Sequence, residues 1–385
     1  MRNNVLLRAI FIILVVAMPL VQASAFQMVP TGDKSASVVV SQETLLQRIT
    51  DRAGPGIASL MAAPVHERIA HLIYGCNGDR DVCSNPKAGT PSAPAAVIAG
   101  VEWNDNPPFL LTGANINECS NAIKNGQVIQ LPKQFLCWAL LLKDAEKKAG
   151  SVSYTIASGS ALILRIHYGD LQFVHAMASK DGENPEVTRK NVMMWAEFTW
   201  RVATGDFILG TRLVTTVPGM EKLFSSGWSV QQIFTLGDPT YRRQIKDVAF
   251  GSLLHLVSDS FALGHTDRAE STGDICIGMP ADYYQPGNIR NFHSYGKQDH
   301  PKHKRADSQD ALDLHLATVG PNILEIGQRL LDLYRTGKKW DDVKPYLECI
   351  FTLDANVTAS VPGTQFSVKE SSPSDMTIPM STQSQ

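Results

Sequence analysis

Apolar residues recur at helical spacing along most of this chain, and the pattern predicts a mainly α-helical protein. Positions three and four apart repeatedly carry aliphatic or aromatic side chains, which is typical of helices with one buried face. A short alternating run near residue 152, Val-Ser-Tyr-Thr-Ile, predicts one strand. We therefore expect an all-α fold, a multi-helix single domain with long loops. The predicted helices cover Pro64–Tyr74, Gln134–Ala149, Ser160–Ala178, Val187–Thr204, Gln244–Leu263, Ser308–Thr318 and Asn322–Thr336.

Several segments lack this periodicity and are expected to be loops or tails. Residues 76–97 are rich in Gly, Pro, Asn and Ser, which predicts a loop closed by a disulfide. Residues 270–300 form a second, longer loop, and loops of this length inside a compact domain are often functional. Residues 26–43 read as a loose lead-in and residues 356–385 as a flexible tail. The helical domain is then expected to span residues 44–355.

The first 25 residues have the layout of a secretory signal peptide. Arg2 and Arg8 precede an apolar run from Ala9 to Leu20. Ala23-Ser24-Ala25 then offers a small-residue cleavage site. The apolar run is short for a membrane span, and no later segment is long and apolar enough to be one. We expect a secreted or periplasmic monomer without a transmembrane anchor after cleavage.

Cysteine content supports export, and net charge bears on possible partners. The six cysteines all follow residue 25, and an even number in an exported chain favours disulfides. Local spacing suggests the pairs Cys76–Cys83 and Cys119–Cys137, which leaves Cys276–Cys349, although other connectivities stay open. The net charge of −2 gives no reason to expect a nucleic-acid partner, which a strongly basic chain would have given.

The most informative stretch for function combines two histidines with an aspartate. His255 and Asp259 are four residues apart, so on a helix they lie on one face. His265 follows Gly264, a residue that often ends helices, and can therefore fold back toward that face. Because imidazole nitrogen and carboxylate oxygen are both zinc ligands, this spacing predicts a metal site. Two ionisable groups on an apolar helix face otherwise need polar partners.

Further motifs contain a histidine, an aspartate or both, which are the residue types that can bind zinc. They are His66-Glu67, the Asp105 of Trp103-Asn104-Asp105, His167 with Asp170 and His175, and His303 with Asp307. Asp170 is expected to hydrogen-bond a ligating imidazole from outside the metal shell. His175 stays open, since it can either cap the core or supply a missing ligand.

Two of these assignments have competitors in the sequence. His71 competes with His66 on the first predicted helix, and His293 and His300 compete with His303 as ligands. The stretch around His303 also carries several lysines and an arginine, so a solvated basic loop is the alternative reading there.

In this order the motifs resemble those of the superfamily of zinc-dependent phospholipases C and single-strand nucleases. The matching elements are His66-Glu-Arg-Ile69, Trp103-Asn-Asp105, Ile166-His167-Tyr-Gly-Asp170, His255…Asp259…His265 and His303…Asp307. They extend over most of the chain after the signal peptide. The residues that surround these motifs are most similar to those of the secreted phosphatidylcholine-hydrolysing phospholipase C group of Gram-negative bacteria.

The resemblance implies a helical fold of that type and a cluster of two or three zinc ions. It implies a first zinc on Asp105, His167, His255 and Asp259, a second on His265, His303 and Asp307, and a third on His66 with Asp259 as bridge. In that family the third zinc also uses the mature N-terminus, whereas the N-terminus expected here, Phe26, lies 40 residues before His66. Another ligand, a further cleavage or a binuclear site are the alternatives.

The implied activity is hydrolysis of phosphatidylcholine to diacylglycerol and phosphocholine, with phospholipid at membrane surfaces as the partner. Asp105 would orient or deprotonate the attacking water, as the corresponding residue does in that family. A nuclease or other phosphodiesterase with the same metals is the first alternative. A non-catalytic exported zinc-binding protein is the second, although it would more often carry a His-rich tract.

Overall fold

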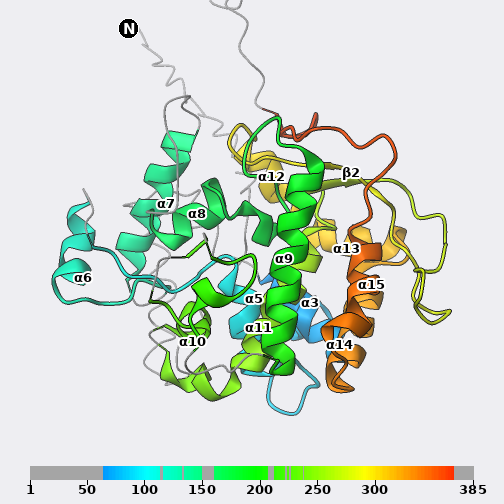
Figure 1. The fold of residues 1–385 in the computed structure, drawn as a ribbon, viewed down its shortest axis with the longest axis horizontal. Coiled ribbons are helices and arrows are strands. Elements are labelled where there is room, and N and C mark those ends of the chain that lie inside the picture. The colour runs from blue at the N-terminus through cyan, green and yellow to red at the C-terminus, as the bar shows by residue number, and fades with distance from the viewer. Residues whose placement is uncertain are drawn as a thin grey trace, which may run out of the picture.

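The computed structural model describes residues 64–112, 116–131, 134–149, 160–206, 212–221, 223–224, 227–236 and 238–367. The expected signal peptide, the lead-in and the strand near residue 152 lie outside these ranges. The described chain is mostly helical (Figure 1). Its helices are α3 (Val65–Ile73), α4 (Arg80–Ser84), α5 (Ala95–Trp103), α6 (Ser120–Lys124), α7 (Phe135–Ala149), α8 (Leu162–Tyr168), α9 (Pro185–Thr204), α10 (Val230–Thr235), α11 (Ile245–Asp259), α12 (His300–Ala306), α13 (Gln309–Thr318), α14 (Ile323–Arg335) and α15 (Trp340–Ile350).

Five helices lie where the apolar pattern predicts them, namely α3, α7, α9, α13 and α14. Local capping explains the ends of α9. The side chain of Asn184 accepts from the backbone N–H of Glu186, and Pro185 fits the first turn because its missing N–H would be unpaired there. Gly205 ends the helix in the left-handed conformation, at φ 78°.

Two predicted helices end earlier than the sequence suggests. The stretch from Ser160 to Ala178 is α8 followed, after a break at Gly169, by the 3-10 helix η2 (Gln172–His175). Helix α11 ends at Asp259 rather than at Leu263, because the backbone then turns toward His265. Both breaks fall beside histidines, so they change where the imidazoles point.

Other elements are missing from the sequence prediction. Helix α5 and the short α4 occupy part of the expected 76–97 loop, and α6, α10, α12 and α15 are also additional. Helix α5 is apolar on nearly all sides, so it shows little of the one-sided pattern that identifies a surface helix. Strands β1 (Thr266–Arg268) and β2 (Ile289–Phe292) pair antiparallel at the two ends of the second expected loop.

The three disulfides are those that local spacing suggests. Cys76–Cys83 joins the end of α3 to α4, Cys119–Cys137 joins the start of α6 to α7, and Cys276–Cys349 joins the long loop to α15. The described residues contain no free cysteine. Among these residues, no helix has both the length and the apolar character needed to cross a membrane.

The first part of the expected C-terminal tail packs against the domain. The N–H of Gly182 donates to the carbonyl of Ser360 at 2.8 Å, and the N–H of Thr358 donates to Arg290 at 3.0 Å. Phe366 is buried against the ring of His293. Residues 368–385 lie outside the described ranges.

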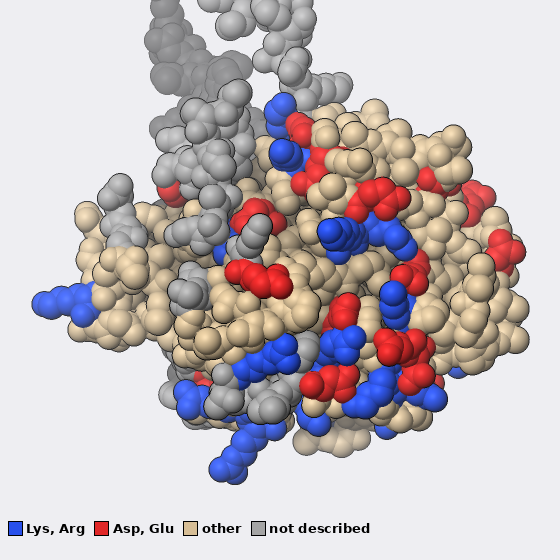
Figure 2. All heavy atoms as spheres, in the orientation of Figure 1, with Lys and Arg blue, Asp and Glu red and all other residues tan. Residues whose placement is uncertain are grey.

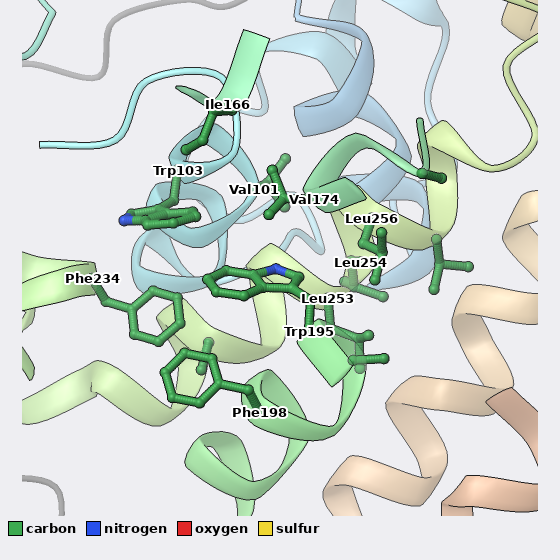
Figure 3. Packing of buried hydrophobic residues seen from close by; sticks show 14 of the residues in the cluster. Val101, Trp103, Ile166, Val174, Trp195, Phe198, Phe234, Leu253, Leu254 and Leu256 are labelled. Atoms are coloured by element: carbon green, nitrogen blue, oxygen red, sulfur yellow. The ribbon is translucent and has the colours of Figure 1, made fainter. Parts of the chain in front are cut away.

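Helix α11 runs through the centre of the molecule, between α5 and the long helix α9 (Figure 1). In the core beside it, Trp103 of α5 stacks on Trp195 of α9 at 5.1 Å, with Phe198 and Phe234 around them (Figure 3). These four aromatic residues are buried.

Two glycines let α5 and α11 approach to backbone contact. A Cβ on Gly251 would lie 2.0 Å from the carbonyl oxygen of Val97, and one on Gly100 would lie 1.9 Å from that of Val248. Both distances are far below van der Waals contact, so any side chain at either position would push the helices apart.

We therefore expect Gly251→Ala to lower the free energy of unfolding by about 3 kcal/mol, because its methyl group meets rigid backbone. Gly327→Ala in α14 is the matched control. Its Cβ meets Cδ1 and Cγ1 of the Ile73 side chain at 2.2 and 2.7 Å, and a side chain can rotate away where backbone cannot, so its cost should be clearly smaller, about 1 kcal/mol. Both variants gain the same helix propensity. Denaturant titration followed by circular dichroism measures the difference, and equal losses would contradict the proposed contact.

Candidate metal centre

Asp259 lies at the centre of a buried group of histidines. Its Oδ2 is 2.9 Å from Nε2 of His255, one turn earlier on α11, and 2.8 Å from Nδ1 of His175. Its Oδ1 is 3.2 Å from Nε2 of His66 on α3. All four side chains are buried. The predicted same-face pair therefore exists, and α11 directs both of its members into the interior.

Around this pair, nine buried side chains form three adjoining groups that could each hold a metal ion. Each group brings three candidate ligand atoms within 4.8 Å of one another. The groups are His66, His255 and Asp259; Asp105, His167 and His175; and His265, His303 and Asp307. The structure thus brings together all eight predicted ligands and adds His175.

The grouping differs in part from the expected one. His255 lies with His66 rather than with Asp105 and His167, although its Nε2 is still 3.9 Å from Asp105 Oδ2. His175 takes the place beside Asp105 and His167 that the sequence leaves open. The break at Gly169 explains this: it lets the rings of His167 and His175 stack at 5.3 Å, although eight residues separate them.

The end of α5 and helix η2 are tied together at this group. The indole N–H of Trp103 donates to a carbonyl of α10 at 2.9 Å, which fixes the last turn of α5. The amide of Asn104 donates to the carbonyl of Val174 at 2.7 Å. Since Asp105 follows Asn104 and His175 follows Val174, this one hydrogen bond sets the distance between two candidate ligands.

Ser258 determines which nitrogen of His66 can bind a metal. Its hydroxyl donates to the carbonyl of His255 at 2.8 Å, so it can only accept from Nδ1–H of His66 at 2.9 Å. The proton then sits on Nδ1, and Nε2 presents a lone pair toward Asp259 Oδ1 at 3.2 Å. Two facing lone pairs repel, unless a cation lies between them.

Backbone carbonyls orient two more rings in the same way. Nδ1 of His255 donates to the carbonyl of Val101 at 2.7 Å, and Nδ1 of His265 donates to the carbonyl of His175 at 2.7 Å. Each ring therefore turns Nε2 toward a carboxylate. Such outer hydrogen bonds are typical of histidines that bind metals.

The donor set fits zinc. Each group has one aspartate with an oxygen that lacks a hydrogen-bond donor, namely Oδ1 of Asp105, Asp259 and Asp307. Nitrogen-to-oxygen distances of 2.9 and 3.2 Å from His303 and His265 to Asp307 are close to the edge of a zinc tetrahedron, about 3.3 Å. Nitrogen and carboxylate oxygen together suit zinc, although other divalent ions accept the same atoms.

Burial and close approach shift the protonation of the ligands strongly. Burial raises the pKa of Asp105 to about 7 and lowers the pKa of His66 to about 3. Burial alone would lower the pKa of His255 and His265, but the carboxylates beside them outweigh it, above all Asp259, and raise these pKa values to about 9 and about 10. His255 and His265 therefore hold protons at neutral pH that a bound cation would displace.

The remaining candidates lie outside the three groups. Asp170 forms an ion pair with Arg165 through both of its oxygens, at 2.8 and 2.6 Å, so the expected bond to an imidazole is wrong. The turn at Gly169 folds Asp170 back onto α8 instead of toward His167.

His71, His293 and His300 do not join a group either. His71 accepts from a backbone N–H of the following segment at 3.1 Å, which leaves His66 as the ligand from α3. His293 Nδ1 lies 3.1 Å from the carbonyl of Gly264, and His300 packs against the ring of Tyr295 at 4.8 Å. Of the three histidines that compete in this part of the chain, His303 is the one that lies in a group that could hold a metal ion.

No protein-family model, curated protein or solved structure matches the chain. The assignment of the centre therefore depends on its own geometry and on the sequence motifs.

We expect zinc to raise the melting temperature and a chelator to lower it, because a bound ion stabilises only the folded state. The increment should shrink steadily as the pH falls from about 10 through about 7, because His265, then His255 and then Asp105 take up protons that compete with the metal. Zinc content by elemental analysis should be two or three ions per chain.

Asp259→Asn should abolish most of the zinc-induced increment, since it removes the charge shared by His66, His175 and His255. Asp170→Asn is the matched control, because it changes the same atoms at a carboxylate outside the three groups. An equal increment in Asp259→Asn, or one that does not depend on pH, would contradict the metal centre.

Proposed function

We propose that this protein is an exported zinc-dependent phospholipase C that hydrolyses phosphatidylcholine to diacylglycerol and phosphocholine, with the helical fold of that enzyme type. The observation that carries the proposal is the convergence of nine buried histidines and aspartates in three adjoining groups. Eight of them belong to motifs that resemble those of the zinc-dependent phospholipases C, in the same order along the chain.

A phosphodiester is hydrolysed when water attacks a phosphorus atom that is already surrounded by negative oxygens. The oxygen of water forms a bond to phosphorus, the bond from phosphorus to the glycerol oxygen breaks, and that oxygen takes up a proton. Zinc, when bound, lowers the pKa of water and offsets charge on the phosphoryl oxygens. The three groups adjoin one another: His175 lies 2.8 Å from Asp259 of the next group, and His265 of the third group lies 3.7 Å from the same carboxylate. They are therefore close enough together to share one phosphate.

Asp105 is the residue we assign to the proton of the attacking water. Its Oδ1 is buried without a hydrogen-bond donor, and the last turn of α5 holds the residue firmly. A pKa near 7 suits a group that must accept a proton at neutral pH and release it again. A bound cation would favour the ionised form of the same carboxylate.

Three disulfides support export, because such bonds persist in oxidising compartments. The sequence adds the expected signal peptide, so we assign the protein to the periplasm or the medium. Figure 2 shows the face of the molecule that is turned to the viewer in Figure 1. On this face, lysine and arginine side chains are interspersed with acidic ones rather than gathered in one basic patch. This face offers no basic track for a polynucleotide backbone, and the net charge of −2 gives no reason to expect one elsewhere, so we favour lipid over nucleic acid as the substrate.

The test is to offer the zinc-loaded protein phosphatidylcholine and single-stranded DNA in parallel, with release of phosphocholine and of nucleotides as readouts. We expect phosphocholine from the first and no nucleotides from the second. Nucleotides without phosphocholine would replace the lipase by a nuclease. Full zinc content without either product would indicate a non-catalytic zinc-binding protein.

Asp105→Asn should lower kcat by a factor on the order of a hundred or more, because it removes the proton acceptor while keeping an oxygen near the metal. Asp170→Asn should leave kcat unchanged, since Asp170 lies outside the three groups. Unchanged kcat in Asp105→Asn would reject its assigned role, and zinc content measured on both variants separates chemistry from metal loss.

A further inference from the structure

A small hollow of about 50 Å³ lies beside the metal centre. The ligands His66 and Asp307 line it on one side. The rest of its wall comes from α3, the end of α11 and the residues after it, α12, α13 and the start of α14, and is mainly apolar. Apolar wall residues include Val65, Ile69, Phe261, Ala262, Ala311 and Leu312. A polar metal centre thus opens onto an apolar wall, so what enters here has a polar and an apolar part.

Two exposed leucines are next to wall residues in the sequence, Leu263 beside Ala262 and Leu314 beside His315. Leu263 follows Ala262 directly and is 57% exposed, and Leu314 is 64% exposed. Leu314 lies three residues after Ala311 on α13, so both occupy one side of that helix. A single exposed leucine is ordinary on a protein surface. Here each leucine belongs to one of the two segments that form the hollow.

The two segments also touch each other beside the hollow. The rings of Phe261 and His315 meet edge to face with centroids 5.5 Å apart. The guanidinium of Arg268 lies over the ring of Phe261 at 4.6 Å and donates to the carbonyl of Ser260 at 2.6 Å. These contacts hold the segment after α11 in place, so Leu263 is presented from a fixed support.

Charge restricts what can contact this surface. Helix α13 contains two acidic residues, Asp310 and Asp313, and no lysine or arginine. Asp313 pairs with Arg68 at 2.6 Å and also with Arg80.

Helix α12, which also borders the hollow, carries Lys302 and Arg305, but Lys302 pairs with Asp299 at 3.5 Å. Anionic membranes are recognised by clusters of basic residues, whereas the basic residues here are mostly paired with acidic ones. An apolar surface without excess positive charge fits a zwitterionic lipid surface instead.

We propose that Phe261, Leu263 and Leu314 form a lipid-docking rim that seats the protein on a zwitterionic phospholipid bilayer, with the hollow and metal centre facing the interface. The proposal rests on the proposed function and deepens it. The leucines enter the boundary between headgroups and acyl chains, and the phosphate of a lipid below the rim reaches His66 and Asp307 without leaving the bilayer entirely.

The test compares the wild-type protein with the double variant Leu263→Ser/Leu314→Ser on two forms of one substrate. Both leucines are largely exposed, so the variant should fold and keep its zinc. On short-chain phosphatidylcholine below its micelle concentration, the rates should be equal. On long-chain phosphatidylcholine vesicles at limiting lipid, the rate should fall by about tenfold or more, because each leucine loses its transfer from water into lipid.

Leu110→Ser is the matched control, since Leu110 is 44% exposed and does not line the hollow. It should hydrolyse both substrate forms at the wild-type rate. Equal losses of the double variant on monomers and vesicles would overturn the rim, as would no loss on vesicles.

Vesicle flotation tests the rim independently of catalysis. The wild-type protein should float with phosphatidylcholine vesicles, and the double variant should bind them about tenfold more weakly or worse. Stronger wild-type binding to phosphatidylglycerol vesicles, unaffected by the leucine changes, would show electrostatic docking and overturn the proposal. If the wild-type protein floats but hydrolyses neither substrate, the proposed function fails while the rim stands.

Discussion

The backbone contact between α5 and α11 sets the geometry of the whole metal centre. Because Gly100 and Gly251 carry no side chains, the carbonyl of Val101 comes within 2.7 Å of Nδ1 of His255 and turns its Nε2 inward. The same close approach brings the end of α5, and so Asp105, to the end of α11. A wider spacing would separate the ligands by more than the length of two metal bonds.

This arrangement conflicts with what a folded core normally favours. Three carboxylates and six imidazoles are buried together, and buried charges cost free energy unless they are paired. The surrounding aromatic core, with Trp103 stacked on Trp195, keeps water out and makes that cost larger. Opposed pKa shifts within one group, down for His66 and up for His255, express the same conflict. Divalent cations would relieve it, since they neutralise the carboxylates and use the lone pairs of the imidazoles.

Sequence alone predicts the parts of this site that follow helical periodicity. Four-residue steps place His255 with Asp259 and His303 with Asp307, and the structure keeps both pairs together. Periodicity does not find α5, because a helix buried on nearly all sides has no polar face. It also extends one helix through Gly169, and therefore leaves His175 undecided.

Backbone turns account for the other differences between sequence and structure. The sequence assigns Gly264 the role of a helix stop, whereas α11 already ends at Asp259. Gly264 is needed for another reason, because a Cβ there would lie 2.6 Å from Nδ1 of His303. Asp170 is misassigned because the same chain break that frees His175 turns it toward Arg165. Contacts between distant segments of this kind leave no periodic signal.

The number of ligands in each group bears on the missing chain terminus. The resemblance assigns the third zinc to His66 and a terminal amine, but in the structure His66 already has His255 and Asp259 as partners. The resemblance assigns His255 to the group of Asp105 and His167, but in the structure His175 is the third member of that group. Internal side chains therefore give each group three candidate ligands without a chain terminus. Because Asp259 also lies 2.8 Å from His175 of the neighbouring group, its two oxygens place it between groups, where a shared carboxylate could bridge two ions.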